Sequence, residues 1–237
     1  SGKWPDLRGF IGAQHARGRR VLLWLKAWDA EGVPAAECVV NAAGAAIAVD
    51  PSNPAYERRL RESVRRMLDP AGYDADGFKL DFTARIPAGP GLRLHDPALR
   101  GLELMRRYLW ILHDEAKRVK PDALIMTHTP NPNQAVLVDM IRLNDINAGS
   151  DVVEAMTHRA RVARAACPEA IIDTDNWPLS DLEQWRRYLG AQADLGVPSL
   201  YVATHQDSTG EPLGEEEYEL LRRTWAQEPA PAGGGHD

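Results

Sequence analysis

The sequence predicts an α/β fold built on a parallel β-sheet. Short apolar runs alternate with longer amphipathic stretches along the 237 residues, and repeated strand–helix units of this kind form parallel sheets covered by helices. An open doubly wound sheet and a (β/α)8 TIM-type barrel both satisfy this pattern. No GxGxxG or Walker loop follows the first predicted strand, which weakens the nucleotide-binding alternative. Polar residues recur at the carboxyl ends of the strands, and in a barrel that edge carries the active site.

The expected strands are short, mostly apolar runs. They are Val21 to Trp28, Gly77 to Phe82, Ala123 to His128, Asp139 to Asn144, Ala170 to Asp175 and Ser199 to His205.

The expected helices are marked by apolar residues at helical spacing and by capping signals. Asn53 is a suitable N-cap, and Pro54 suits the first position of a helix that runs to Leu68. Three further helices begin at Asp96-Pro97, at the capping box Asp151-Val152-Val153-Glu154 and at the capping box Ser180-Asp181-Leu182-Glu183. A last helix covers Glu215 to Trp225, and the Pro/Gly-rich residues 228–237 are expected to be a disordered tail.

Composition excludes several classes of protein. The net charge of −6 argues against non-specific nucleic-acid binding. No apolar run approaches the roughly 20 residues that a membrane span needs, and no basic-then-apolar signal peptide opens the sequence. We therefore expect no nucleic-acid or membrane partner and a cytoplasmic location. The two cysteines, Cys38 and Cys167, are interpreted as free thiols, and no cofactor is predicted.

The strand Gly77 to Phe82 carries two charged residues among apolar ones. Strand side chains alternate, so Lys79 and Asp81 share one face while Phe78, Leu80 and Phe82 take the other. A charge in such a strand is costly unless it is paired. The spacing therefore fits a structural Lys79–Asp81 pair and a functional site equally well.

The same strand resembles a known catalytic strand. Asp76-Gly77-Phe78-Lys79-Leu80-Asp81-Phe82, continuing to Arg85-Ile86-Pro87, resembles the nucleophile strand of retaining α-glycosidases, nearest to the α-xylosidase-like members of glycoside hydrolase family 31. The α-galactosidases of the same clan also carry a Lys-x-Asp strand. Upstream segments add to the resemblance, which covers about residues 4 to 205: Trp4-Pro5-Asp6-Leu7, His15-Ala16-Arg17-Gly18, Val21-Leu22-Leu23-Trp24 and Val49-Asp50-Pro51-Ser52-Asn53-Pro54.

The resemblance implies a TIM-type barrel and a retaining mechanism with two carboxyl groups. Asp81 would be the nucleophile at the end of the fourth barrel strand. Lys79 would bond sugar hydroxyls and favour the ionised form of Asp81. The acid/base would follow the sixth barrel strand, where Asp145 is our choice. Asp151 is the competitor, but a role as a helix cap is sufficient to explain it.

Further residues are candidates for substrate contact. Trp24, Trp28 and Trp177 would form a sugar-stacking platform or belong to the core, and Lys26 shares the strand face of Trp24 and Trp28. Arg142 would reach a sugar hydroxyl or form an ordinary salt bridge. His128 and His205 would contact substrate. Asp173, Asp175 and His205 would equally line a metal site, but HxH and HExxH spacings are absent from the sequence, so no metal is predicted.

The resemblance also makes Val21 the start of the third barrel strand, which leaves the first two strands unaccounted for. We therefore expect residues 1–227 to form an N-terminally incomplete barrel domain with an exposed sheet edge. Another segment or an oligomer partner would complete it.

Three function classes follow. The first is a retaining α-glycosidase acting on a glycoside or oligosaccharide, of the α-glucosidase, α-xylosidase or α-galactosidase kind. The second is a non-catalytic carbohydrate-binding barrel. The third is a metal-dependent barrel enzyme of aldolase or amidohydrolase type.

Overall fold

The computed structural model describes residues 4–145, 151–175 and 179–227. The predicted Trp177 and the expected tail lie outside these residues. The chain divides into two compact units, Ser1–Thr127 and His128–Asp237. The α/β class is confirmed, with parallel strands β1, β4 and β5 in the first unit and β6 and β7 in the second. The closed (β/α)8 barrel stays a prediction.

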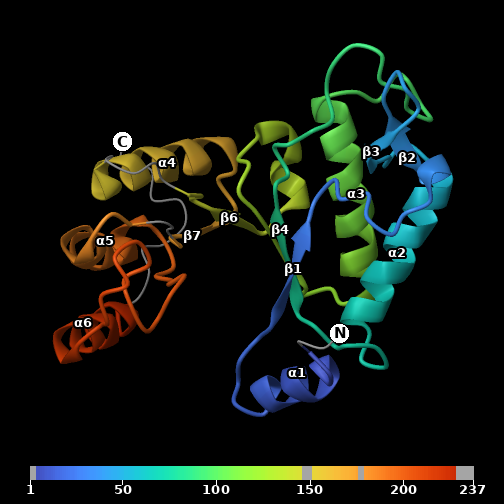
Figure 1. The fold of residues 1–237 in the computed structure, drawn as a ribbon. Coiled ribbons are helices and arrows are strands. Elements are labelled where there is room, and N and C mark those ends of the chain that lie inside the picture. The colour runs from blue at the N-terminus through green and yellow to red at the C-terminus, as the bar shows by residue number, and fades with distance from the viewer. Residues whose placement is uncertain (1–3, 146–150, 176–178, 228–237) are drawn as a thin grey trace. The chain divides into compact units, whose positions relative to one another are not determined.

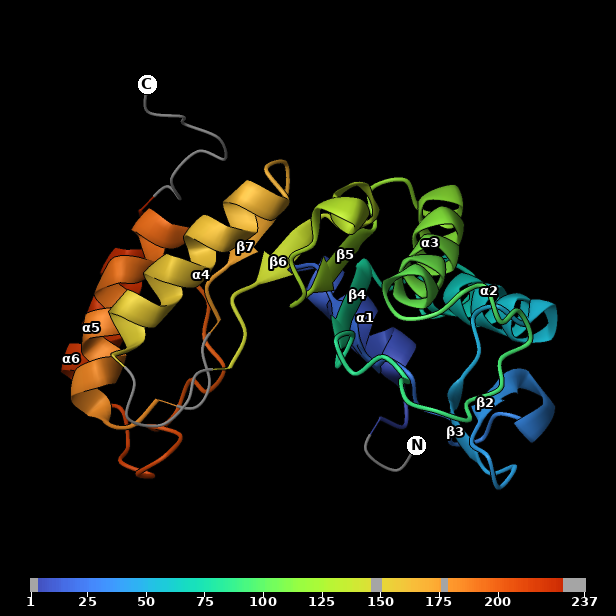
Figure 2. The same ribbon diagram turned by 90° about the horizontal axis from the view of Figure 1, so that it is seen from above.

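The first unit is a three-stranded parallel sheet covered by helices. Its strand order is β1 (Leu22–Lys26), β4 (Gly77–Asp81) and β5 (Leu124–Thr127). Helices α2 (Pro54–Leu68) and α3 (Leu102–Val119) lie side by side against it, and α1 (Leu7–His15) precedes β1 (Figures 1 and 2). The register places Trp24 opposite Lys79 and Lys26 opposite Asp81.

Gly77 permits the close pairing of β4 with β5. A Cβ atom at this position would lie 2.0 Å from the carbonyl oxygen of Leu124, and the φ angle of Gly77 is 147°. Both facts require glycine at the start of the strand. The residue therefore helps to set the register that carries Lys79 and Asp81 to the strand's end.

The cap of α2 is confirmed, whereas the start of α3 differs from the prediction. Asn53 caps α2 by accepting a hydrogen bond from the amide of Ala55, with Pro54 following it. The helix expected at Asp96 begins instead at Leu102, after Gly101 with a φ of 56°. The Asp96 side chain accepts from the amide of Ala98, so it closes a local turn rather than capping the helix.

A hairpin between β1 and α2 was not anticipated. It consists of η1 (Ala35–Glu37), β2 (Cys38–Val40) and β3 (Ala46–Val49), with β2 and β3 antiparallel. The side chain of Asn41 accepts from the amides of Ala43 and Ala45 and forms the turn. The two strands are too short for a clear period-two pattern in the sequence.

The second unit pairs two strands with three helices. After η2 (Pro132–Leu137), β6 (Met140–Arg142) and β7 (Ile171–Asp173) run parallel, with Arg142 opposite Asp173. Helices α4 (Val152–Ala166), α5 (Leu182–Leu195) and α6 (Glu215–Trp225) lie side by side (Figures 1 and 2). Asp151 caps α4 as predicted, and α5 is capped by Asp181, one residue later than Ser180.

The strand expected from Ser199 to His205 is wrong. This segment contains only an isolated bridge between His205 and Pro212, after another between Val197 and Asp173. The carbonyl of Ser199 accepts from the Gln192 side chain, and that of Val197, just before the segment, accepts from the Thr174 hydroxyl. Pro198 has no amide hydrogen to donate to a ladder.

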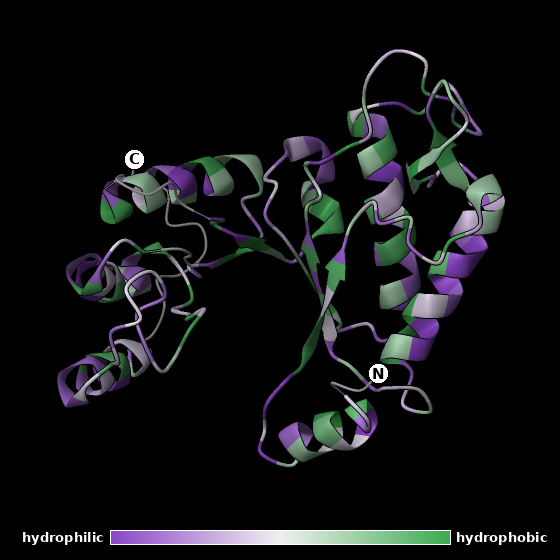
Figure 3. Ribbon diagram, in the orientation of Figure 1, coloured by the Kyte–Doolittle hydropathy of each residue, from purple (hydrophilic) through white to green (hydrophobic). Residues whose placement is uncertain are grey.

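Buried apolar residues form the core of each unit. Phe78, Leu80 and Ile125 are at most 1% exposed in the first unit, and Ile141 and Met156 in the second. Figure 3 shows the strands mostly in green, whereas α2 and α3 mix both colours. Cys38 and Cys167 are both buried free thiols, as expected. Among the described residues, no helix combines the length and the apolar character needed to cross a membrane.

Candidate active site

The carboxylate of Asp81 lies at the carboxyl end of β4 with both oxygens oriented by donors. The indole Nε1 of Trp24 donates to Oδ2 at 3.1 Å, and the amide of Phe82 donates to Oδ1 at 2.8 Å. The side chain is half-buried. An oriented carboxylate that solvent can still reach is the arrangement expected of a nucleophile or of a sugar-hydroxyl acceptor.

Trp24 and Lys79 lie beside this carboxylate. Trp24 is 53% exposed, and its ring meets that of Phe82 edge to face, with centroids 6.3 Å apart. Lys79 is half-buried, on the same face of β4 as Asp81 and opposite Trp24 in the register. The structure thus brings together an exposed indole, a carboxylate and an ammonium group, which are the groups that stack on and bond to sugars.

Lys26 and Trp28 take different positions. Lys26 forms an ion pair with Asp29, with Nζ and Oδ2 2.9 Å apart. Trp28 is only 6% exposed. Its Nε1 donates to the carbonyl of Thr83 at 3.0 Å, and its ring packs on Tyr108 at 5.3 Å. Trp28 therefore lies in the core and does not share an exposed platform with Trp24.

The backbone explains why the two tryptophans separate. β1 ends at Lys26, and Trp28 adopts a left-handed φ of 68°. The alternation that placed Trp24 and Trp28 on one face therefore stops before Trp28.

Left-handed backbone recurs where strands end. Four described non-glycine residues have a left-handed φ: Trp28, Phe82 and Asn144, at 68°, 59° and 70°, follow β1, β4 and β6, and Asp74, at 60°, precedes β4. Such conformations are costly for residues with side chains and gather at functional sites. Trp28 and Phe82 in the first unit and Asn144 in the second thus lie at the carboxyl ends of strands, where the sequence pattern also places polar residues.

In the second unit, Arg142 connects two carboxylates. Its Nε donates to Oδ2 of Asp175 at 2.7 Å, and its Nη2 donates to Oδ1 of Asp145 at 2.7 Å. Arg142 and Asp175 are 5% and 4% exposed. Burial by itself would lower the pKa of Arg142, but the two carboxylates raise it above the usual value. Arg142 is thus a fixed cation that orients Asp145.

Asp145 and Asp151 differ in what holds them. The Asp145 side chain is 48% exposed and pairs with Arg142. The Asp151 carboxylate accepts from the amide of Glu154 at 3.0 Å and pairs with Arg187 at 2.8 Å. The hydrogen bond from the Glu154 amide, together with Arg187, lowers the pKa of Asp151. Both oxygens of Asp151 therefore have structural partners, in agreement with its predicted role as a helix cap.

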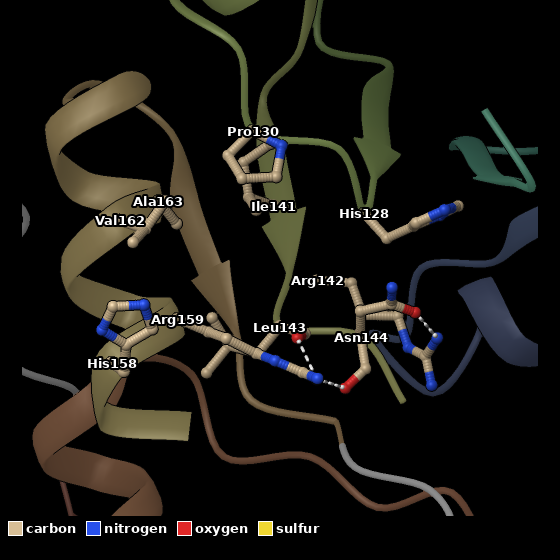
Figure 4. Close-up of a pocket in the computed structure, with 10 residues that line it drawn as sticks. All are labelled: His128, Pro130, Ile141, Arg142, Leu143, Asn144, His158, Arg159, Val162 and Ala163. Atoms are coloured by element: carbon tan, nitrogen blue, oxygen red, sulfur yellow. Dashed lines mark hydrogen bonds between the residues drawn. The ribbon is translucent and has the colours of Figure 1, made fainter. Parts of the chain in front are cut away.

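His128 and His205 line separate pockets of the second unit. His128 is half-buried and borders a cavity of about 270 Å3 between α4 and the end of β6, together with Arg142, Asn144, His158 and Arg159 (Figure 4). His205 is exposed, and its Nδ1 lies 2.9 Å from the hydroxyl of Thr204. The structure does not bring these two histidines to one site.

The third function class, a metal-dependent enzyme, would need a cluster of metal-ligating side chains, and the described part of the chain shows none. There, no three His, Cys, Asp or Glu side chains are grouped so that they would hold a metal ion. Asp175 is bound to Arg142, and Asp173 accepts from the Ser199 hydroxyl and from the amide of Asp175. These contacts leave Asp173, Asp175 and His205 poorly suited as a ligand set.

Sequence reasoning missed Arg159, which extends from α4 to the backbone at the end of β6 (Figure 4). An arginine on an amphipathic helix carries no local signal for such a contact.

No protein-family model matches the chain, and the search of curated proteins finds no match either. Solved structures do match its fold. A GH31 dextranase from Flavobacterium johnsoniae, complexed with glucose, is similar with a TM-score of 0.68 and 12% identity, over 93% of this chain and 32% of that one. The chain has a GH31-like fold.

Two further structures share this GH31-like fold. The cycloalternan-forming enzyme from Listeria monocytogenes is similar with a TM-score of 0.67 and 16% identity, over 94% of this chain and 24% of that one. The cycloalternan-degrading enzyme from Trueperella pyogenes, in complex with a covalent intermediate, is similar with a TM-score of 0.64 and 19% identity, over 94% and 34%. The chain therefore spans about a quarter to a third of the length of these structures.

Proposed function

We propose that the chain is part of a glycoside hydrolase that cleaves α-glycosidic bonds with retention. Asp81 is the proposed nucleophile and Asp145 the acid/base. The observation that carries the proposal is the half-buried carboxylate of Asp81, which lies beside exposed Trp24 at the end of β4. The GH31-like fold and the similarity to glycosidases support it.

The proposed reaction has two steps. An oxygen of Asp81 attacks the anomeric carbon, the bond to the leaving oxygen breaks, and Asp145 gives its proton to that oxygen. Asp145 then takes a proton from water, whose oxygen attacks the anomeric carbon and releases Asp81. The two carboxyl groups of a retaining enzyme lie about 5–5.5 Å apart. Asp81 belongs to the first unit of this chain and Asp145 to the second.

The neighbours of Asp81 have definite roles in this proposal. The indole N–H of Trp24 and the amide of Phe82 hold the carboxylate in one orientation. Holding it in this way lowers the entropy cost of reaching a reactive geometry. The exposed face of Trp24 offers a stacking surface for a sugar ring. Lys79 contributes a donor and a positive charge on the same face.

Arg142 orients the Asp145 carboxyl group in the unliganded chain, since the guanidinium donates to it at 2.7 Å. In the second step Asp145 acts as a base, and a carboxylate held in one orientation suits that role. The first step requires a proton on Asp145, so this ion pair must loosen when a glycoside binds. The hydrogen bonds to Asp175 would keep Arg142 in place during that exchange.

A covalent label tests the nucleophile. A fluorinated α-glycoside that traps the glycosyl-enzyme should add one sugar mass, and peptide mass spectrometry should locate it on Asp81. Asp81→Asn should lose labelling and turnover while its thermal unfolding stays close to that of the wild type, because the substitution conserves shape. A label on any other residue would contradict the assignment.

A non-catalytic carbohydrate-binding role is the second candidate. The pairing of Asp145 with Arg142 favours it, since a fixed ion pair provides no free acid. Aryl α-glucoside, α-xyloside and α-galactoside substrates separate the candidates. Binding measured by calorimetry without turnover of any of them would favour the binding role.

We also propose that a further strand, from a segment of the protein outside these 237 residues, pairs with β1. β1 stands at one end of the strand order. A groove of about 510 Å3 runs along it and is lined by apolar and aromatic residues, among them Trp4, Phe10 of α1 and Trp24 of β1. Parallel sheets rarely leave an edge of this kind uncovered. The matched structures, which are about three to four times longer, support such an occupant.

A further inference from the structure

Arg159 binds three successive backbone carbonyl groups with one nitrogen. Its Nη1 donates to the oxygens of Leu143 at 3.0 Å, Asn144 at 2.8 Å and Asp145 at 2.6 Å. Figure 4 shows the side chain extending from α4 to the segment that follows β6. An arginine that bonds three consecutive carbonyls holds the path of the backbone there, not merely one side chain.

The backbone conformation of Asn144 directs the carbonyl groups of residues 143–145 toward Arg159. The left-handed φ of 70° at Asn144 turns the chain immediately before Asp145. The same turn lets the side-chain oxygen of Asn144 accept from the amide of Asp145 at 2.8 Å. Asparagine tolerates this conformation better than most residues, but carbonyl dipoles pointing the same way repel one another unless a donor lies among them.

The rest of the segment is tied to β7. The amide of Leu143 donates to the carbonyl of Asp173 at 3.0 Å, and Leu143 is 3% exposed. The sheet therefore holds this short segment through the Leu143 amide, and Arg159 holds it through its carbonyl groups. These two sets of hydrogen bonds together fix the position of the Asp145 backbone, from which its side chain extends.

Arg142 and Arg159 act on Asp145 in different ways. Arg142 contacts the carboxylate itself, whereas the Arg159 bonds reach the backbone of the same residue. Burial lowers the pKa of Arg159, an effect that the nearby charge of Asp145 opposes. Burying a cation costs desolvation free energy, and the hydrogen bonds to the three carbonyl groups offset this cost.

We propose that Arg159 is a positioning residue that holds the 143–145 backbone and so places the Asp145 carboxyl group for proton transfer. The inference rests on the proposed acid/base role of Asp145. Arg159 touches no reacting atom in this scheme. We expect the loss of Arg159 to slow the hydrolysis of glycosides for which proton donation to the leaving group limits the rate. The attack by Asp81 on the anomeric carbon should be little affected.

The first test is independent of turnover. Hydrogen exchange followed by mass spectrometry should show faster exchange in peptides covering residues 140–145 in Arg159→Met than in the wild type. Arg164→Met is the matched control, because Arg164 is also on α4 and donates to the carbonyls of Leu195 and Asp194, away from this segment. Unchanged exchange in Arg159→Met would overturn the inference.

The second test separates proton donation from general damage. In Arg159→Met, hydrolysis of α-glycosides with poor leaving groups should fall by about 10²-fold, the size of a general-acid contribution. Dinitrophenyl glycosides, whose leaving group needs no proton, should lose less than about threefold. Arg159→Lys, which keeps a donor, should recover part of the loss and serves as the test variant if Arg159→Met does not fold.

The outcomes distinguish the two proposals. If the wild type hydrolyses none of the glycosides, the proposed function fails, and the role of Arg159 in placing Asp145 for proton transfer fails with it. If the wild type is active and Arg159→Met slows poor and activated leaving groups equally, the glycosidase stands and the positioning role is wrong.

Discussion

Trp24 and Trp28 stand four residues apart in the chain and have opposite surroundings. Trp24 is 53% exposed and gives its indole hydrogen to Asp81, whereas Trp28 is 6% exposed and packs on Tyr108. Two residues of one type can thus have unrelated roles in neighbouring positions. The structure assigns Trp28 to the core and leaves Trp24 available to a ligand.

This contrast predicts opposite effects of truncation. Trp28→Ala should destabilise the fold by about 3–5 kcal/mol, as expected for removal of a buried aromatic side chain. Trp24→Ala should change stability far less but raise KM for an α-glycoside, because a stacking surface beside Asp81 is lost. Urea unfolding and steady-state kinetics measure the two quantities. Equal losses of stability would contradict the assignment.

At the scale of elements, the start of α4 distinguishes the two acid/base candidates. Asp151 is the N-cap, and asparagine caps a helix about as well as aspartate. Asp151→Asn should therefore keep both the helix and the activity. Asp145→Asn should lower the hydrolysis of poor leaving groups by about 10²–10⁴-fold, since it removes the proposed proton donor. Kinetics on the two variants, with circular dichroism as a fold control, decide between them; loss of activity only in Asp151→Asn would reverse our choice.

Helices α2 and α3 are joined by a buried carboxylate. Glu115 of α3 is 1% exposed and accepts from Arg65 at 2.6 Å, from Arg61 at 3.2 Å and from Arg118. Burial by itself would raise the pKa of Glu115, but the hydrogen bonds from these arginines outweigh it and hold the pKa below its usual value.

A lowered pKa in the folded state makes the contribution of Glu115 pH-dependent. The stabilisation is fully present above the pKa of the unfolded chain, and it is lost as the pH falls through the folded-state pKa. Glu115→Gln should therefore lower the free energy of unfolding by about 3 kcal/mol at pH 7, and the difference should shrink as the solution is acidified below pH ~4. Urea unfolding from pH 3 to 7 measures this. Glu215→Gln, which removes an exposed ion pair with Arg222, is the control and should show little effect.

At the scale of the whole molecule, the GH31-like fold is shared with structures of which this chain spans about a quarter to a third. The edge strand β1 and its aromatic groove are where the remainder of such a protein is proposed to attach. An uncovered edge of this kind pairs readily with other chains.

The proposed missing strand predicts self-association. The 237-residue chain alone should show a concentration-dependent mass in size-exclusion chromatography with light scattering, because exposed Phe10 and Trp24 flank β1, the end strand of the order formed by the described residues. A longer natural form that contains the pairing strand should give a constant mass and a higher Tm. A constant monomer mass for the 237-residue chain, together with a closed eight-stranded barrel in an experimental structure, would contradict the proposal.

Much of the fold was predictable because its signals are local. The Asn53 and Asp151 caps depend on residues within one helical turn, and both are confirmed. The burial of Phe78 and Leu80, with Lys79 and Asp81 only half-buried, follows from strand alternation. At the expected strand Ser199 to His205, the Gln192 side chain on α5 donates to the carbonyl of Ser199, which is then engaged outside a strand ladder. An apolar run does not reveal such competition.

The sequence by itself determined the α/β class, the cap of each confirmed helix and the strand that carries Lys79 and Asp81. Those features depend on neighbours close in the chain. Only the tertiary structure decided that Trp28 is buried, that Arg142 joins Asp145 to Asp175 and that Arg159 binds the backbone after β6. These contacts join residues that lie far apart in sequence, or they depend on left-handed backbone at Trp28 and Asn144, where the regular alternation of a strand no longer applies.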